Sequence, residues 1–292
     1  MPFPRILLFG KVGQVGWELR RTLAPLSELV CVDYPEVDFA NPGSIRKWIA
    51  DAAPRIVINA AAYTAVDKAE TETALAMKIN AEAPEVMAVE AKKKGLLLVH
   101  YSTDYVFDGT KTSPYVEEDL PNPLGAYGRS KLAGDRAIEQ VGCDHLIFRL
   151  CWVYGARGAN FMLTMMRLAR EREKLRVVHD QYGCPTWSRM IAEATALALH
   201  QAARPGQAAA CRGLYHLCSS GQTSWHGFAR SIVELMPVAG RKCREVEAIS
   251  SSEYPTPAKR PPYSVMSGGK LERVFGLRLP DWHDSLRLVL DQ

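Results

Sequence analysis

The sequence lacks any C-x-x-C pair, and its seven cysteines show no metal-ligand spacing with histidine. An odd, scattered set of thiols indicates a reducing compartment. The sequence also lacks a run of eighteen apolar residues, so we expect no transmembrane helix and no membrane partner. No positively charged and then apolar leader precedes the first strand-like run. We therefore expect a cytoplasmic protein.

The sequence also has little net charge. The formal net charge is +4, and three lysines at positions 92–94 form the only notable basic run. We interpret that run as the solvated end of a helix and expect no nucleic-acid partner. A hydrophobic fraction of 47% and a charged fraction of 23% are ordinary for a globular protein with a sizeable core. The 292 residues can form one large α/β domain and a smaller appended one.

Short apolar runs alternate with helical patterns along the first half of the chain. Each apolar run is bounded by turn residues or charge, which is typical of a strand buried on both faces. We predict strands at residues 5–9, 29–32, 55–59, 96–101 and 145–154, and helices at 16–23, 44–52, 74–77 and 82–94. Such alternation requires a parallel sheet with helices on both faces. The predicted fold class is therefore α/β, with a Rossmann-type doubly wound parallel sheet.

The second half of the chain is less regular. We predict strands at residues 175–178 and 214–218, and helices at 190–201, 225–236 and 282–290. A joint rich in glycine, alanine and arginine covers residues 202–212, and a proline-rich connection covers residues 254–263.

A glycine-rich loop follows the first predicted strand. Gly10 permits the tight turn, Gly13 lets the backbone approach a pyrophosphate, and Gly16 lets the next helix pack close to the strand. The helix N-terminus then offers free N–H groups to the phosphates. A bare structural turn is the alternative, but the strand before and the helix after supply the context that the motif needs. The residues predicted to bind the dinucleotide here are Gly10, Lys11, Gly13, Gln14, Val15 and Gly16.

Two residues near this loop give conflicting signals about the cofactor. Asp33 ends the second predicted strand, where an acid would bond the ribose hydroxyls of the adenosine and favour NAD. Lys11 could instead meet a 2′-phosphate and favour NADP. We therefore predict that the protein accepts NADPH or NADH. Asp38 and Phe39 are candidates for the adenine pocket, although a turn acid would explain Asp38 equally well.

Small residues follow the third predicted strand, and we expect Ala60, Ala61, Ala62 and Tyr63 to pass along the cofactor. With this loop included, we expect a dinucleotide-binding domain over residues 1–152 that the chain re-enters around residues 175–201. A smaller C-terminal domain, mainly substrate-binding, would cover residues 153–292.

Tyr127 and Lys131 lie four residues apart, on one face of a predicted helix. An unperturbed tyrosine has a pKa near 10, so it needs help to exchange a proton at neutral pH. A nearby lysine ammonium would lower that pKa and could also hold the nicotinamide ribose. The spacing is common by chance. Here, however, a dinucleotide loop lies upstream and a polar strand end lies between the loop and the pair.

That polar strand end comprises Ser102, Thr103, Asp104 and Tyr105, after the fourth predicted strand. In a doubly wound sheet, ligands bind at the carboxyl ends of the strands. Thr103 would hydrogen-bond a substrate carbonyl and share its developing charge with Tyr127. The catalytic residues predicted from the sequence are thus Thr103, Tyr127 and Lys131.

With these motifs, the sequence resembles the extended short-chain dehydrogenase/reductase superfamily, and within it the dTDP-4-dehydrorhamnose reductase family. The resemblance covers nearly the whole chain and includes residues 7–19, 59–70, 102–107, 127–134, 148–154, 180–186 and 254–261. It implies reduction of the C4 ketone of a dTDP-linked 6-deoxy-4-keto sugar, with the hydride taken from nicotinamide. It also implies that Tyr127 protonates the ketone oxygen.

The resemblance further implies a pocket for the dTDP-sugar. Asp104, Tyr105 and Trp152 match family positions at the sugar. Asn160, Arg260 and the turn at residues 180–186 are further candidates for the nucleotide and sugar, although Asp180 and Thr186 fit equally well as turn and cap residues.

The sequence departs from the family pattern at two places. Some members dimerise around a divalent ion held by glutamates; Glu18 matches one of these, but Arg189 and Gln292 align with the others. An arginine cannot ligate a cation, so we expect no bound metal, and a homodimer of another kind stays open. Tyr263 stands where relatives often carry a smaller polar residue, which changes the local substrate contacts.

Three alternatives share this scaffold. A nucleotide-sugar dehydratase would need a glutamate directly after Asp104, where this chain has Tyr105. An epimerase acting at C4 is harder to exclude from residues alone. A non-catalytic, NADP-binding regulatory subunit, like that of methionine adenosyltransferase, would need no tuned pair. The presence of Thr103, Tyr127 and Lys131 favours catalysis.

Overall fold

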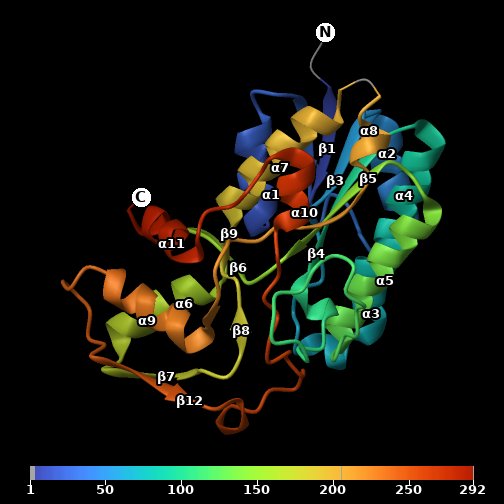
Figure 1. Ribbon diagram of the computed structural model, residues 1–292. Helices are drawn as coiled ribbons and strands as arrows, with labels where there is room; N and C mark the ends of the chain where they lie inside the picture. Colours follow the sequence, from blue (N-terminus) through green and yellow to red (C-terminus); the bar gives the residue numbers. More distant parts are fainter. Residues whose placement is uncertain (1–3, 205, 292) are drawn as a thin grey trace.

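A six-stranded, all-parallel sheet forms the centre of the protein (Figure 1). The computed structural model describes residues 4–204 and 206–291. Across the sheet, the strands are β2 (Glu28–Val32), β1 (Arg5–Phe9), β3 (Ile56–Asn59), β4 (Leu97–Thr103), β5 (His145–Leu150) and β10 (Gly213–His216). The chain winds outward from β1 to β2 on one side and from β3 to β10 on the other. This is the predicted doubly wound sheet, and its strand order reverses between β1 and β3, where sheets of this kind bind ligands at the carboxyl ends of the strands.

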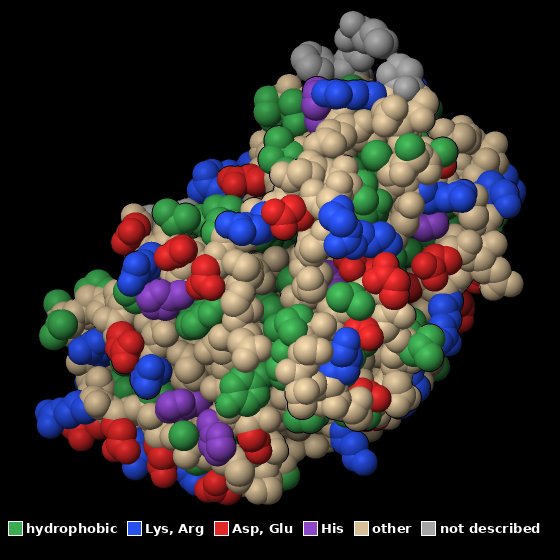
Figure 2. Space-filling model, in the orientation of Figure 1, with side chains coloured by type: hydrophobic (Ala, Val, Ile, Leu, Met, Phe, Trp, Pro, Cys, Tyr) green, Lys and Arg blue, Asp and Glu red, His purple; other side chains and the backbone are tan. Residues whose placement is uncertain are grey.

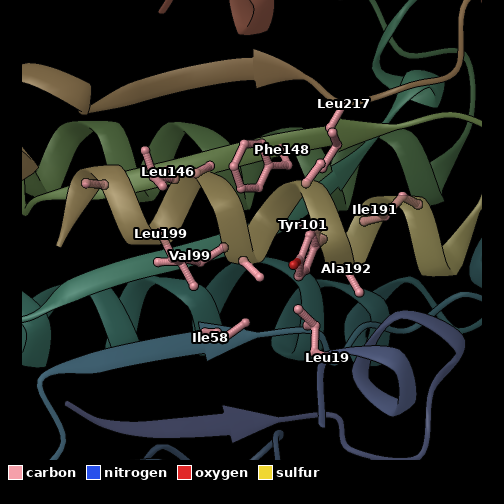
Figure 3. Close-up of a cluster of buried hydrophobic side chains, with 14 of the residues drawn as sticks. Leu19, Ile58, Val99, Tyr101, Leu146, Phe148, Ile191, Ala192, Leu199 and Leu217 are labelled. Carbon is pink, nitrogen blue, oxygen red and sulfur yellow. The ribbon is translucent and has the colours of Figure 1, made fainter. Parts of the chain in front are cut away.

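Helices cover both faces of this sheet because its strands are apolar on both sides. One face carries α1 (Gln14–Leu23), α7 (Ser188–Ala202) and α10 (Gly269–Phe275); the other carries α2 (Pro42–Ala52), α4 (Ala83–Lys94) and α5 (Ala126–Val141). Figure 3 shows Ile191 and Leu199 of α7 in one cluster with Tyr101 of β4 and Phe148 of β5. The closely packed apolar side chains on the two faces of the sheet hold the strand ends in fixed positions.

The two helices expected at residues 74–77 and 82–94 form one continuous run. Helix α3 (Thr73–Met77) passes through a single π turn (Lys78–Glu82) into α4. In this turn, the buried Asn80 amide accepts from the backbone N–H of Tyr63 (2.8 Å) and donates to its carbonyl (3.0 Å). Asn80 also donates to Ser130 Oγ of α5 at 3.0 Å. The turn therefore fastens the segment after β3 to the helix that carries Tyr127.

The single strand expected at residues 145–154 is wrong. β5 ends at Leu150, and β6 (Val153–Tyr154) pairs with β9 (Thr186–Trp187) outside the central sheet. Between them, Trp152 has a φ of 43°, a left-handed conformation that breaks a strand. β4, by contrast, continues two residues beyond its predicted end and includes Ser102 and Thr103.

A second group of elements packs around its own core, at the lower left of Figure 1. It contains α6 (Phe161–Glu171), α9 (Trp225–Leu235), α11 (Trp282–Leu290) and the parallel pair β7 (Lys174–Val178) and β12 (Glu245–Ile249). Smaller pieces are β8 (Tyr182–Gly183), which pairs with β11 (Thr223–Ser224), and α8 (Ala208–Cys211). We did not predict α6, α10 or β12. In the segment 175–201, β7 belongs to this group, whereas α7 packs against α1.

Charges of both signs are interspersed on the face shown in Figure 2. Over β7 and β12, Lys174 pairs with Glu245 and Glu247, each at 3.1 Å, and Arg176 pairs with Glu253 at 2.7 Å. Among the described residues, no helix combines the length and the apolar character needed to cross a membrane.

Candidate active site

A cleft of about 1010 Å3 opens at the carboxyl ends of β1, β3 and β4. Its wall comes from the loops after these strands and, across the cleft, from Val153 and Trp225. Most of the predicted site residues lie in this wall. They are Gly10, Gly13, Gln14, Val15, Asp33, Asp38, Phe39, Ala60, Ala61, Ala62, Tyr63, Ser102, Thr103, Asp104, Tyr105, Tyr127, Lys131 and Trp152.

The glycine loop has the shape that a pyrophosphate requires. Gly10 has a φ of 86°, and a Cβ there would lie 2.5 Å from the backbone of Ala60. A Cβ on Gly16 would lie 1.9 Å from the carbonyl oxygen of Gly10. A Cβ on Gly13, in contrast, would meet no protein atom closer than 3.6 Å. Because the N-cap residue of α1, Gly13, has no side chain to cap the helix, the first N–H groups of α1 remain available to a phosphate.

The two acids expected near the adenosine, Asp33 and Asp38, already accept hydrogen bonds from backbone N–H groups. The Asp33 carboxylate accepts from the N–H of Val12 (2.9 Å) and from that of Tyr34 (2.8 Å). Asp38 accepts from the N–H of Ala40 at 2.9 Å, as a turn acid does, although it also lines the cleft. Phe39 packs edge-on against Phe9, with ring centroids 5.9 Å apart, and forms a flat apolar wall.

Tyr127 lies in the first turn of α5, facing the cleft beside Thr103. Its ring packs edge-on against that of Tyr105, with centroids 5.8 Å apart. Desolvation by the surrounding protein raises the pKa of Tyr127 to about 12, against a lowering by a hydrogen bond with Thr103. The negative charge of Asp104 adds to the increase. The expected lowering of the Tyr127 pKa by Lys131 is therefore not found in this structure.

The side-chain nitrogen of Lys131 points at groups other than Tyr127, which explains why it does not lower the pKa of that tyrosine. Its Nζ donates to the carbonyl oxygen of Tyr101 at 2.7 Å and lies 3.2 Å from His100 Nε2. Lys131 is 1% exposed, and burial lowers its pKa to about 8. Its proton can therefore exchange near neutral pH.

The tautomer of His100 also indicates that Lys131 can be uncharged. Asn59 Oδ1 accepts from the N–H of Ala61 (3.2 Å), so Asn59 Nδ2 faces His100 Nδ1 (3.1 Å) and must donate to it. This assignment follows from the hydrogen-bond network. A neutral His100 then carries its proton on Nε2, which faces Lys131 Nζ. An uncharged amine accepts this hydrogen bond, whereas an ammonium does not.

A buried ion pair lies beneath this group. Asp135 of α5 accepts from Ser102 Oγ at 2.8 Å and from Arg149 Nε at 3.3 Å. Asp135 is 0% exposed and Arg149 is 3% exposed. Desolvation raises the pKa of Asp135, and the charges of Arg149 and Lys131 oppose that change. The Ser102 hydroxyl is thus committed to Asp135.

Replacing Asp135 with asparagine should destabilise the protein by about 3 kcal/mol, because it leaves the Arg149 guanidinium buried without a counter-charge. Urea unfolding measures the change. The matched control is Asp51→Asn, which removes a carboxylate from the exposed pair Lys47–Asp51 and should cost less than about 1 kcal/mol. Equal losses in the free energy of unfolding would show that the buried pair stabilises the protein no more than the exposed pair.

The substrate side of the cleft is built around Asp104. Its carboxylate accepts from Ser264 Oγ (2.6 Å), Thr103 Oγ1 (3.1 Å) and Cys151 Sγ (3.2 Å). Burial raises the pKa of Asp104 to about 6, against these three hydrogen bonds. Opposite, the Trp152 ring stacks on Trp225, with centroids 3.5 Å apart and planes 6° apart.

Four predicted site residues lie outside the wall of the cleft. Gly16 lies behind it, against Gly10. The Lys11 amine pairs with Glu36. Asn160 caps α6 by accepting from the N–H of Leu163 at 3.0 Å, and it donates to Gln14 Oε1 at 2.9 Å.

Arg260 is the fourth, and it donates to Asp67 Oδ2 at 2.9 Å. In the turn at residues 180–186, Asp180 accepts from the N–H of Ser251 at 2.9 Å, and Thr186 donates to the carbonyl of Cys184 at 2.9 Å. Tyr263 donates to Gln222 Oε1 at 3.1 Å.

Arginines lie near Glu18, at the place where the family resemblance implied a metal site. Glu18 is 7% exposed and lies 4.0 Å from Arg21, and Arg189 pairs with Glu193 at 3.0 Å. Gln292 lies outside the described residues. Within residues 4–204 and 206–291, no group of three or more His, Cys, Asp or Glu side chains is arranged to hold a metal ion.

Sequence reasoning missed several residues of this site. Trp225 carries a detectable signal, because it opens an amphipathic helix at a polar strand end. His100, Asp135 and Arg149 carry none, since each is a common residue type in a regular strand or helix pattern.

Known proteins match this chain over nearly its whole length. The sequence matches the family model described as the RmlD substrate binding domain over residues 4–292. A dTDP-4-dehydrorhamnose reductase of Burkholderia thailandensis is 50% identical over 291 residues, covering 98% of each chain. That of Escherichia coli K12 is 44% identical and covers 98% of this chain and 97% of the relative. The solved structure of the Bacillus anthracis dTDP-4-dehydrorhamnose reductase in complex with NADP is 33% identical, with a TM-score of 0.91 over 99% of each chain.

Proposed function

The chain belongs to the RmlD substrate binding domain family, and from this membership we propose that it catalyses the NADPH-dependent reduction of dTDP-4-dehydrorhamnose to dTDP-L-rhamnose. The observation that carries the proposal is the match, over nearly the whole chain, to curated reductases of this one activity. The cleft supports it, because a glycine loop and the group Thr103, Tyr127 and Lys131 line the same space.

The cofactor, when bound, supplies a hydride to C4 of the sugar. We assign its pyrophosphate to the N–H groups at the start of α1, where Gly13 leaves room for it. The Bacillus anthracis relative is in complex with NADP, which supports NADPH, and we propose that NADH is accepted as well.

Tyr127 is the proposed proton donor to the ketone oxygen. Its phenol is protonated at neutral pH, as a general acid must be before the hydride is transferred. Thr103 lies in the same cleft wall, and we propose that its hydroxyl binds the ketone oxygen beside Tyr127. Lys131 lies one turn along the same face of α5, and we propose that it holds the nicotinamide ribose. Its low pKa, about 8, lets its buried amine gain or lose a proton near neutral pH.

The sugar is proposed to bind between Asp104 and Tyr105 on one side and the stacked rings of Trp152 and Trp225 on the other. These residues share the cleft wall with Tyr127. We propose that residues 1–152 with α7 bind the cofactor and that the C-terminal elements mainly cover the sugar. A cytoplasmic location is also proposed, because all seven cysteines, each within the described residues, are free thiols.

The test is NADPH oxidation followed at 340 nm with enzymatically generated dTDP-4-dehydrorhamnose. We expect one NADPH consumed per sugar and dTDP-rhamnose as the product, with slower or comparable turnover on NADH. Absence of oxidation by a folded enzyme that binds the cofactor would contradict the proposal. A C4 epimer formed without net consumption of cofactor would identify an epimerase instead.

A further inference from the structure

The side chain of Lys11 is already paired with a carboxylate that the sequence did not point to. Lys11 Nζ lies 2.8 Å from Glu36 Oε1 and 2.6 Å from Glu36 Oε2. Glu36 Oε2 also accepts from the backbone N–H of Asp33 at 3.1 Å. The hydrogen bond with Lys11 and that backbone contact lower the pKa of Glu36. Glu36 therefore stays charged and holds the amine of the glycine loop against the end of β2.

This pair borders the adenosine end of the cleft. Val12, Asp33 and Tyr34, which flank the pair in the chain, line the cleft wall. In this fold, the residue at the end of the second strand faces the ribose of the adenosine, where NADP carries its extra phosphate. A 2′-phosphate there would lie near two carboxylates, Asp33 and Glu36. It would also lie near the Lys11 ammonium, which is already paired with Glu36. A ribose with a free 2′-hydroxyl meets no such conflict.

We propose that Glu36 determines the choice between NADPH and NADH by competing with the 2′-phosphate for Lys11. NADH leaves the ion pair in place, whereas NADPH binds with Lys11 turned from Glu36 to the phosphate. The Glu36 side chain is 47% exposed and that of Lys11 is 25% exposed, so this exchange needs no change in the core. The proposal specifies the cofactor preference of the proposed reductase, and it concerns cofactor binding alone.

A glutamine at position 36 can keep both contacts of this loop. Its amide oxygen can still accept from the backbone N–H of Asp33, as Glu36 Oε2 does, and the backbone carbonyl of residue 36 still accepts from Trp48 Nε1 at 3.0 Å. Glu36→Gln keeps the length of the side chain and removes the charge. We expect it to tighten NADP+ binding about fivefold to tenfold, because Lys11 is freed and one repulsive charge is lost. NAD+ binding should change less than about twofold.

The experiment measures the dissociation constants of NADP+ and NAD+ by calorimetry in the absence of any sugar, so a failed reductase assay does not affect it. Lys11→Met should weaken NADP+ about tenfold and leave NAD+ nearly unchanged. In the double variant Lys11→Met/Glu36→Gln, most of the gain from Glu36→Gln should disappear, because the competition requires the lysine. Equal thermal midpoints would show that all variants are folded.

The matched control is Glu28→Gln. Glu28 forms an exposed pair with Arg5 at the opposite end of the sheet, 2.8 Å apart, and its loss changes the net charge by the same amount. We expect no change in either dissociation constant. The proposal is overturned if Glu36→Gln leaves the NADP+/NAD+ ratio unaltered, if it tightens both cofactors equally, or if the gain persists without Lys11.

Discussion

Replacing Tyr127 with phenylalanine is expected to lower kcat about 10³-fold, the usual contribution of a positioned general acid. The phenylalanine ring fills the same space against Tyr105 but has no proton to give. Because Tyr127 is not part of the glycine loop, the affinity for NADP+ should change less than about threefold. Steady-state kinetics at 340 nm and calorimetry measure the two quantities separately.

The control for this variant is Tyr254→Phe, which removes a hydroxyl from a side chain that is 63% exposed. It should leave kcat unchanged. Because the pKa of Tyr127 is about 12, wild-type kcat should show no loss from Tyr127 deprotonation between pH 7 and pH 9. A Tyr127→Phe enzyme with wild-type turnover would remove Tyr127 from the mechanism and leave the proton donor unassigned.

Replacing Gly16 with alanine is expected to lower the affinity for the cofactor by about two orders of magnitude. The new Cβ would lie 1.9 Å from the carbonyl oxygen of Gly10, and that oxygen belongs to the backbone and cannot rotate away. The loop must therefore move off α1, at a cost of about 2 kcal/mol in the free energy of unfolding. Calorimetry and urea unfolding should both report the change.

Gly13→Ala separates the two effects. Its Cβ meets no protein atom closer than 3.6 Å, so we expect the free energy of unfolding to fall by less than about 1 kcal/mol. The methyl group would nevertheless stand where we place the pyrophosphate, so cofactor affinity should still fall about tenfold or more. If Gly13→Ala bound the cofactor normally, the phosphate would have to lie elsewhere.

The parts of the fold that could be predicted are those fixed by local pattern. The sequence predicts the bounds of β1, β3, β4 and α11 almost correctly, because a strand buried on both faces leaves a continuous apolar run and a helix buried on one face leaves a clear period. The run from His145 to Tyr154 gave no warning of its break. It is apolar except for His145 and Arg149, and the break falls at Trp152, which stacks against Trp225, a partner that is distant in sequence.

The site shows the same limit. The spacing of Tyr127 and Lys131 indicated a shared helix face, but not that the lysine turns toward His100 and the carbonyl of Tyr101. That direction is set by β4, a different element. Lys11 was assigned to the cofactor from its position in the loop, whereas its observed partner, Glu36, comes from the loop after β2. Residue types could be predicted from the sequence, but their partners across elements could not.

The order in which the chain builds its central sheet constrains how the protein can be made. The sheet is completed by β10, and one of its faces by α7 and α10, the last of which ends at Phe275. A ribosome must therefore release nearly the entire polypeptide before the nucleotide-binding half can close its core. A gene fragment that stops at residue 152 would leave the edge of β5 unpaired and Leu146 and Phe148 uncovered. The two halves of the cleft are thus interleaved in the chain, and we expect residues 1–152 expressed alone to expose surface that β10, α7 and α10 cover in the intact protein.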